Sequence, residues 1–187
     1  MIAYSQSSPP SRQISDQVLA TTLLVLTEAM FFSALLSAYW VMKSGLGPWA
    51  PPENVRIPIL TGLLNVAVLS TSGVLIYISN RSFGKQSSFY FYVVGTLLGI
   101  LFVGFQSYEW VKLFKVGMTM HSGLFSASFF LLVGSHAVHA ACAAVALIIG
   151  SVAFGRGTLK LNQLRALSLF WYFVVAIWPI LYGTVYL

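Results

Sequence analysis

Charge is the scarcest property of this sequence. Its 187 residues include ten basic and four acidic side chains, so 7% of the chain is charged while 58% is hydrophobic. This composition is typical of an integral membrane protein and not of a soluble domain. The basic residues are scattered among short polar segments and form no single patch, which argues against nucleic-acid binding.

Cysteine is almost absent as well. Cys142 is the only one, so the chain can form neither an internal disulfide nor a zinc or iron–sulfur site built from several cysteines. We interpret Cys142 as an inert packing residue. The alternating pattern of a membrane β-barrel is also missing, which leaves a helical bundle as the fold class.

Long apolar runs dominate what is present. Five of them reach the ~20 residues that a membrane-spanning helix needs. They cover Asp16–Met42, Pro58–Ser79, Ser87–Phe114, Ser122–Ala153 and Leu164–Leu187. The sequence therefore predicts an all-α integral membrane bundle of five transmembrane helices. Residues 1–187 form a single membrane domain in this interpretation, with a mobile tail over about residues 1–15 and the bundle over 16–187.

Basic residues are distributed unevenly between the two ends of this bundle. Six fall on the side of the N-terminus, namely Arg12, Arg81, Lys85, Arg156, Lys160 and Arg165. Four fall on the opposite side, namely Lys43, Arg56, Lys112 and Lys115. The excess predicts a cytoplasmic N-terminus and a C-terminus outside. The Gly- and Pro-rich loop Ser44–Ile57 predicts either an ordered cap that contacts a partner or an interfacial anchor formed by Trp49.

A few polar residues fall inside the predicted helices and therefore need an explanation. They are Glu28, Asn65, Gln106, Glu109, His136 and His139. A carboxyl group at membrane depth costs at least a few kcal/mol, so such residues usually face protein or take part in proton or ion chemistry. His136 and His139 are near mid-membrane, as Glu28 is, so a contact between the helices is geometrically feasible. Gln106 and Glu109 lie near one helix end.

Three interpretations compete for these residues. A metal or haem site is disfavoured because Glu109 lies far along the axis from Glu28 and because the third histidine, His121, belongs to a loop. A proton path is the second interpretation, but no ladder of buried acids leads from the mid-membrane residues to either surface. The third, which we favour, is a buried hydrogen-bond network of Glu28, His136 and His139 that fixes helix register.

Four segments, in order along the chain, carry a resemblance to a known family. Thr27–Phe32 resembles Ser-Glu-x-Met-Phe-Phe, and Gln106–Trp110 resembles Gln-x-x-Glu-Trp/Tyr at a helix end. Ser128–His139 is similar to Phe-Phe…Gly-x-His-x-x-His, and Phe170–Trp178 resembles Tyr-Trp-His-Phe-Val-Asp-x-x-Trp. These elements belong to subunit III of the haem-copper terminal oxidases, which include cytochrome c oxidases. The resemblance covers nearly the whole chain except the first two helices of many family members, and so implies the five-helix bacterial form.

The resemblance implies an accessory, cofactor-free subunit of an enzyme complex, without an active site of its own. Haem and copper would belong to partner subunits, chiefly subunit I, with subunit II receiving electrons. The chain would support proton uptake and stabilise subunit I in the bacterial cytoplasmic membrane, in part through phospholipid held in a cleft between helices. In the five-helix form one wall of that cleft is missing, so we expect lipid or another subunit to cover the Glu28 side.

Two departures from the family pattern fall on the last helix. Tyr172 stands where the family usually has His, and Val175 stands where it usually has Asp, so this helix has lost a polar pair. Pro179 occupies a usually apolar position and predicts a kink. The alternatives to a cytochrome c oxidase are a quinol oxidase subunit III, a related accessory protein of nitric oxide reductase, and an independent small transporter or b-type cytochrome.

Overall fold

The computed structural model describes residues 15–45, 49 and 59–186. Within these ranges the chain forms five helices, each long and apolar enough to cross a membrane, which confirms the predicted all-α class. They are α1 (Asp16–Gly45), α2 (Ile59–Arg81), α3 (Gln86–Lys115), α4 (Leu124–Gly155) and α5 (Leu161–Val185). Every helix end lies within three residues of its predicted position.

Short connections with glycine in a left-handed conformation separate the later helices. Gly117 has φ +85° directly after α3, where its N–H donates to the carbonyl of Phe114, and the next N–H, of Met118, donates to that of Leu113. These bonds satisfy carbonyl groups that the helix end leaves free, in a conformation that glycine adopts without steric cost. Gly157 has φ +70° just after α4. Such tight turns make consecutive helices antiparallel neighbours.

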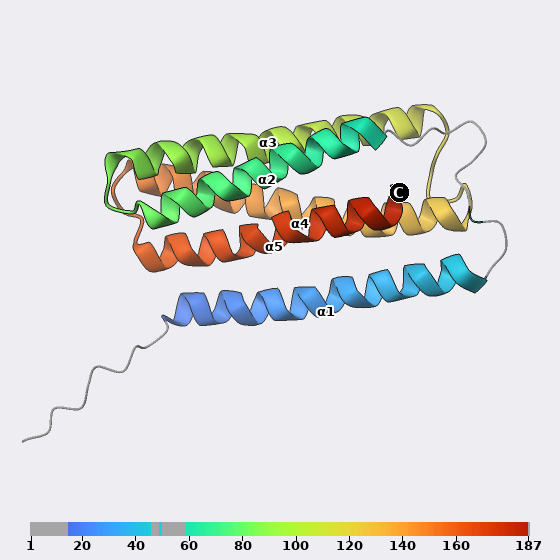
Figure 1. Ribbon diagram of the computed structural model, residues 1–187, viewed down its shortest axis with the longest axis horizontal. Helices are drawn as coiled ribbons and strands as arrows, with labels where there is room; N and C mark the ends of the chain where they lie inside the picture. Colours follow the sequence, from blue (N-terminus) through green and yellow to red (C-terminus); the bar gives the residue numbers. More distant parts are fainter. Residues whose placement is uncertain (1–14, 46–48, 50–58, 187) are drawn as a thin grey trace, which may run out of the picture.

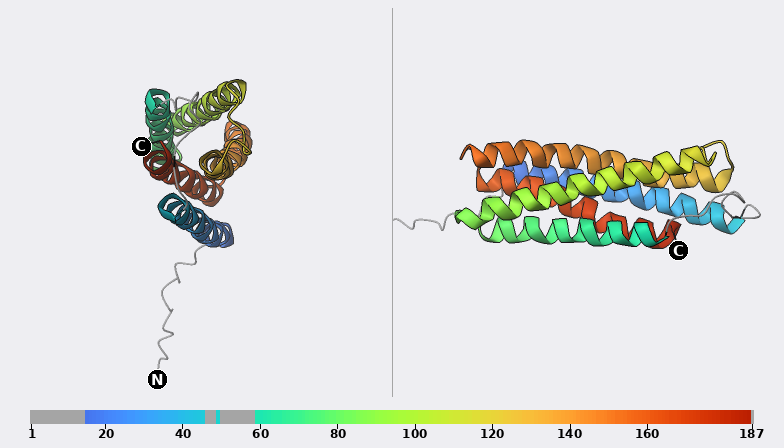
Figure 2. Two further views of the ribbon diagram at one scale, coloured as in Figure 1. Left: turned by 90° about the vertical axis from the view of Figure 1, so that its right-hand side faces the viewer. Right: turned by 90° about the horizontal axis from the view of Figure 1, so that it is seen from above.

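The helices are arranged as a ring of four with a fifth outside it. Helices α2, α3, α4 and α5 follow one another around the ring, and α5 closes it by packing on α2 (Figure 2). Helix α1 lies alongside the ring next to α5 and also touches α4 (Figure 1). In the most apolar stretch of α1 only 6% of residues are buried, against 28–39% in the other helices. Most of the α1 surface therefore faces outward.

Tryptophan and glycine from different helices interlock in the core of the ring. A Cβ atom at Gly99 of α3 would lie 2.6 Å from the Trp171 ring of α5, so only glycine leaves room for that ring. The Trp171 Nε1–H donates to Ser72 Oγ of α2 at 3.1 Å, and this hydroxyl donates to the carbonyl of Gly95 at 2.6 Å. The buried polar groups are thus satisfied across three helices.

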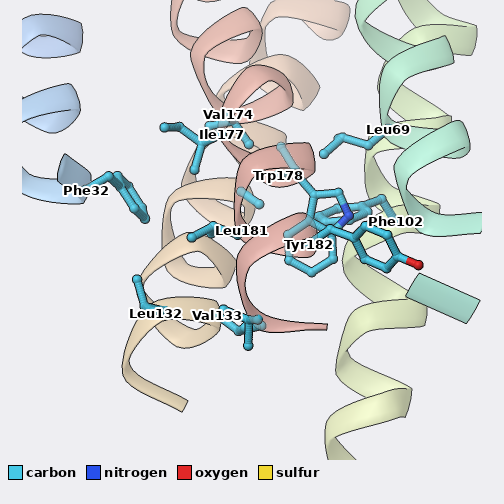
Figure 3. Packing of buried hydrophobic residues seen from close by; sticks show 14 of the residues in the cluster. Phe32, Leu69, Phe102, Leu132, Val133, Val174, Ile177, Trp178, Leu181 and Tyr182 are labelled. Atoms are coloured by element: carbon cyan, nitrogen blue, oxygen red, sulfur yellow. The ribbon is translucent and has the colours of Figure 1, made fainter. Parts of the chain in front are cut away.

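Aromatic rings fill the next layer of the core. Trp178 of α5 packs on Phe102 of α3 with ring centroids 5.2 Å apart, and Phe32 projects from α1 toward the ring of helices (Figure 3). Phe32 and Tyr39 are the buried residues of α1. Helix α1 therefore buries two aromatic side chains, both on one face, against the rest of the bundle.

Parts of the sequence-based predictions fall outside the described residues. The predicted tail and most of the Ser44–Ile57 loop do so. Trp49 is described, and its ring packs edge-on against Tyr39 at 5.2 Å and Phe125 at 5.8 Å, so it joins the end of α1 to α4. Helix α5 continues through Pro179. The kink expected there stays a prediction.

Candidate functional site

Glu28 and His139 meet between α1 and α4. Their Oε2 and Nε2 atoms are 2.8 Å apart, and about a fifth of each side chain is exposed, 23% for Glu28 and 19% for His139. Both residues lie within three positions of the middle of their helices. For helices centred in a bilayer, the pair is therefore near the membrane midplane.

The hydrogen bond of His139 Nδ1 limits the protonation states that the pair can adopt. Nδ1 is 2.7 Å from the carbonyl oxygen of Ser135, one turn earlier in the same helix. A carbonyl can only accept, so Nδ1 carries a hydrogen and donates it. Nε2 then either accepts a hydrogen bond from a neutral Glu28 carboxyl or, in an imidazolium ring, donates one to a carboxylate. In both cases one proton lies between Oε2 and Nε2.

His136 is placed differently, although it is three residues away. It is 1% exposed, and neither ring nitrogen has a hydrogen-bond partner among the described residues. Its ring stacks on Trp178 with centroids 5.1 Å apart and contacts the edges of Phe32 and Phe102. The structure therefore brings Glu28 and His139 together and places His136 in the aromatic core without a hydrogen bond to either.

Gln106 belongs to a separate polar cluster, toward the C-terminal end of α3. Its Oε1 accepts a hydrogen bond from Asn65 Nδ2 of α2 at 3.3 Å, and its Nε2 donates to the Tyr186 hydroxyl at 3.5 Å. Glu109, one turn further on, pairs with Lys112 at 3.1 Å. Tyr186 was not singled out from the sequence, because a tyrosine near a helix end normally reads as an interfacial anchor.

Tyr172 and Val175, the two residues of α5 that depart from the family pattern, both contact α2. The Tyr172 hydroxyl accepts a hydrogen bond from Asn80 Nδ2 of α2 at 3.1 Å. Val175 packs against Gly73, where a Cβ atom would approach the valine side chain to 3.1 Å. At this point α2 and α5 are held by one hydrogen bond and one close apolar contact.

Metal-ligating side chains do not gather anywhere in the described ranges: no group of three or more His, Cys, Asp or Glu is found there. Cys142 is exposed on α4 and forms no disulfide. The Glu28–His139 pair offers two potential ligands, fewer than metal sites in helical bundles normally use. What the pair can do chemically is hold one proton and one hydrogen bond between two helices.

Comparison with known proteins decides what kind of bundle this is. The family model for cytochrome c oxidase subunit III matches residues 15–187. The chain belongs to the cytochrome c oxidase subunit III family. This confirms the resemblance seen in the sequence motifs and makes the chain a multi-pass membrane subunit of an oxidase complex of the cytochrome c or quinol type, which implies other oxidase subunits as partners.

Individual relatives of the family come from both oxidase types. The chain is 28% identical over 177 residues to cytochrome c oxidase subunit 3 of Corynebacterium diphtheriae. The aligned region covers 89% of this chain and 85% of the relative. It is 27% identical over 174 residues to a probable quinol oxidase subunit 3 of Staphylococcus haemolyticus, covering 88% and 85%. Cytochrome c oxidase subunit 3 of Thermostichus vulcanus is 24% identical over 179 residues, covering 91% and 87%.

Proposed function

We propose that this member of the subunit III family is an accessory, cofactor-free subunit of a haem-copper oxidase that stabilises subunit I and supports its proton uptake. The observation that supports an accessory role is the closed geometry of the Glu28–His139 pair. His139 Nδ1 donates to a carbonyl of its own helix, and among the described residues no further ionisable side chain forms a hydrogen bond with either member. A proton relay would need a further ionisable group beside the pair, whereas a hydrogen bond that only holds two helices together does not.

The structural role of the pair follows from where α1 lies. Within the part of the chain that is described, Glu28–His139 is the one hydrogen bond between α1 and the ring, apart from a 4.0 Å contact of the Ser128 hydroxyl with the Met42 sulfur. The pair therefore sets the register and rotation of α1 against α4. We propose that His136 contributes to the same junction through its ring contacts with Phe32 and Trp178.

The Glu28 side of α1 is proposed to be covered in the complex by lipid or by another subunit. An open hollow of about 380 Å³ lies beside the pair, lined by Thr27, Glu28, Phe31 and His139. A partly exposed carboxyl at mid-membrane depth is costly unless something shields it. A structure of the oxidase in which Glu28 faces bulk lipid with no ordered neighbour would count against this cover.

Orientation and location complete the proposal. At the end of the bundle that holds the start of α1, the described residues include five basic side chains and Asp16, whereas the opposite end has three. This distribution supports an N-terminus in the cytoplasm of a bacterium, with the bundle in its cytoplasmic membrane. In a Cys142→Ser background, Ser82→Cys and Thr119→Cys lie at opposite ends. A membrane-impermeant maleimide added to intact cells should label the second and spare the first.

We take cytochrome c as the electron donor of the parent enzyme, with a quinol oxidase as the first alternative. A related accessory protein of nitric oxide reductase is the remaining alternative, because membership of the family argues against an independent transporter. Copper-containing oxidase subunits that co-purify with the chain would exclude the nitric oxide reductase alternative. Turnover of the co-purified enzyme with reduced cytochrome c, and not with a quinol, would decide between the two oxidases.

The decisive experiment removes the chain from its complex. We expect the tagged chain, gently solubilised, to bring haem absorbance and oxygen consumption with it. After the chain is stripped off, the remaining enzyme should keep its haem spectrum but lose activity faster during turnover. A chain that purifies alone as a stable, colourless bundle would refute the proposal. A depleted enzyme that turns over as long as the intact one would refute the stabilising role.

A further inference from the structure

Glu28 has one carboxyl oxygen that its contact with His139 does not use. Oε2 is 2.8 Å from His139 Nε2, whereas Oε1 has no hydrogen-bond partner among the described residues. The Glu28 side chain is 23% exposed and lines the hollow of about 380 Å³ together with Thr27, Phe31 and His139. Oε1 therefore needs a hydrogen-bond donor in a membrane-embedded, apolar setting.

The other residues that line the hollow have no donor to spare. The Thr27 hydroxyl donates to the carbonyl of Leu24 in its own helix at 2.7 Å. His139 Nδ1 donates to the carbonyl of Ser135, and Nε2 is taken up by Oε2. Phe31 has no polar atom in its side chain. The donor for Oε1 must therefore come from another molecule.

Depth in the membrane decides which molecule can supply this donor. Glu28 lies within three residues of the middle of α1, which is within about 5 Å of the midplane for a centred helix. The headgroups of phospholipids, which carry their polar groups, begin about 15 Å from the midplane. Acyl chains have no donor, and the hydrocarbon core offers no water in their place. A side chain on a membrane-spanning helix can reach this depth.

Charge decides which kind of side chain fits. One proton lies between Oε2 and Nε2, so the Glu28–His139 pair has no net charge in either of its two protonation states. Oε1 accepts in both states, as the carbonyl oxygen of a neutral carboxyl or as a carboxylate oxygen. A lysine or arginine would add an uncompensated positive charge at mid-membrane depth. The donor is therefore a neutral group.

Helix α1 also has a surface on which a partner helix can pack beside the hollow. Exposed positions repeat at alternating spacings of three and four residues, and they are Leu24, Thr27, Phe31, Ala34, Ala38 and Val41. This spacing is that of the seam between two packed helices. Ala34 and Ala38 are small, so a partner backbone can approach closely there.

From the unused oxygen, its depth and the neutral pair, we propose that a transmembrane helix of another oxidase subunit packs along this stripe of α1. A hydroxyl, indole or amide group of that helix donates a hydrogen bond to Glu28 Oε1. The inference rests on the cover proposed for Glu28 and assigns that cover to protein instead of lipid. It does not depend on the role in proton uptake.

Photo-crosslinking in the purified oxidase identifies the neighbour. Phe31 is replaced by the photoreactive amino acid benzoylphenylalanine, and the complex is illuminated in nanodiscs. Mass spectrometry should find Phe31 linked to a transmembrane helix of another subunit. Leu26 is the control site: it is 56% exposed but points about 140° away from Phe31 around α1, so it should give mainly lipid adducts. Thr27 replaces Phe31 if that variant does not assemble.

The rate at which the tagged chain dissociates from the oxidase measures the hydrogen bond. Glu28→Leu removes the bonds to His139 and to the partner, whereas His139→Leu removes the first alone. Glu28→Leu should therefore dissociate about 3- to 30-fold faster than His139→Leu, the factor expected for one hydrogen bond between membrane helices. Glu28→Gln keeps a carbonyl oxygen for the partner and an N–H for His139 Nε2, so it should stay within about twofold of the wild type.

Two results would overturn the inference. One is a Phe31 probe that forms lipid adducts alone, and the other is a Glu28→Leu variant that dissociates no faster than His139→Leu. In both cases haem absorbance that still co-purifies with the chain would leave its place in the oxidase intact. A chain that never co-purifies with haem would instead refute the proposed function itself.

Discussion

Breaking the contact between Glu28 and His139 should loosen α1 from the ring. Interhelical hydrogen bonds in membranes contribute about 0.6–2 kcal/mol. Replacing one partner leaves the other unsatisfied, so each single change, Glu28→Leu or His139→Leu, should cost about 1–3 kcal/mol. The double variant leaves no orphaned group and should lose less than the sum of the two. We expect a coupling energy of about 1–2 kcal/mol.

The assay is the thermal stability of the chain within the solubilised oxidase, followed as the tagged chain that remains in the soluble complex after heating. For a chain of this size, about 1 kcal/mol corresponds to about 2–4 °C in Tm. Each single variant should therefore lower the Tm by several degrees, and the double variant by less than their sum. Ser33→Ala is the control on the same helix, because the Ser33 hydroxyl bonds only to the carbonyl of Ala29 in its own helix.

Strict additivity of the two changes would refute the reasoning. It would mean that the 2.8 Å contact contributes nothing beyond the separate environments of the two side chains. A drop in the Ser33→Ala control as large as that of Glu28→Leu would also refute it, because the loss would then reflect any polar change on α1.

Three further outcomes are expected from substitutions elsewhere. Gly99→Ala should destabilise the chain by about 1–3 kcal/mol through overpacking, whereas Gly104→Ala on the same helix, with open space around it, should be neutral or stabilising; thermal stability of the two variants checks this. Trp49→Ala should lower the Tm by removing the ring between α1 and α4, and the exposed Trp40→Ala should not, as the same heating assay will show. Tyr172→Phe should cost about 0.5–1.5 kcal/mol, measured as the shift in Tm, because it deletes one interhelical hydrogen bond.

The helices themselves were predictable because membrane spans are specified by length and apolarity. Depth along the helices made a contact between Glu28 and a histidine of the fourth helix feasible, and the structure contains one with His139. Which histidine it would be did not follow: residues three apart on a helix differ by about 60° in direction, and that rotation turns His139 toward α1 and His136 into the aromatic core.

The position of α1 outside the ring could not be read from the sequence. In a soluble protein the exposed face of a helix is polar, but in a membrane both the lipid-facing and the protein-facing sides are apolar. From residue type alone, the exposed Leu23 and Met30 therefore cannot be distinguished from residues of the protein core. The hydrogen bond between Asn80 and Tyr172 was not predicted for another reason: the two residues are 92 positions apart, and Asn80 belongs to none of the motifs.

The outer position of α1 has a consequence for how the protein is made. Within the described residues its neighbours are α4 and α5, the last two helices to leave the ribosome. Glu28 precedes His139 by 111 residues, so at about 5–20 residues per second it spends roughly 6–22 s in or near the bilayer before its partner is synthesised. The first helix of this chain must therefore enter the membrane carrying an uncompensated carboxyl group, and it can dock only when synthesis is nearly complete.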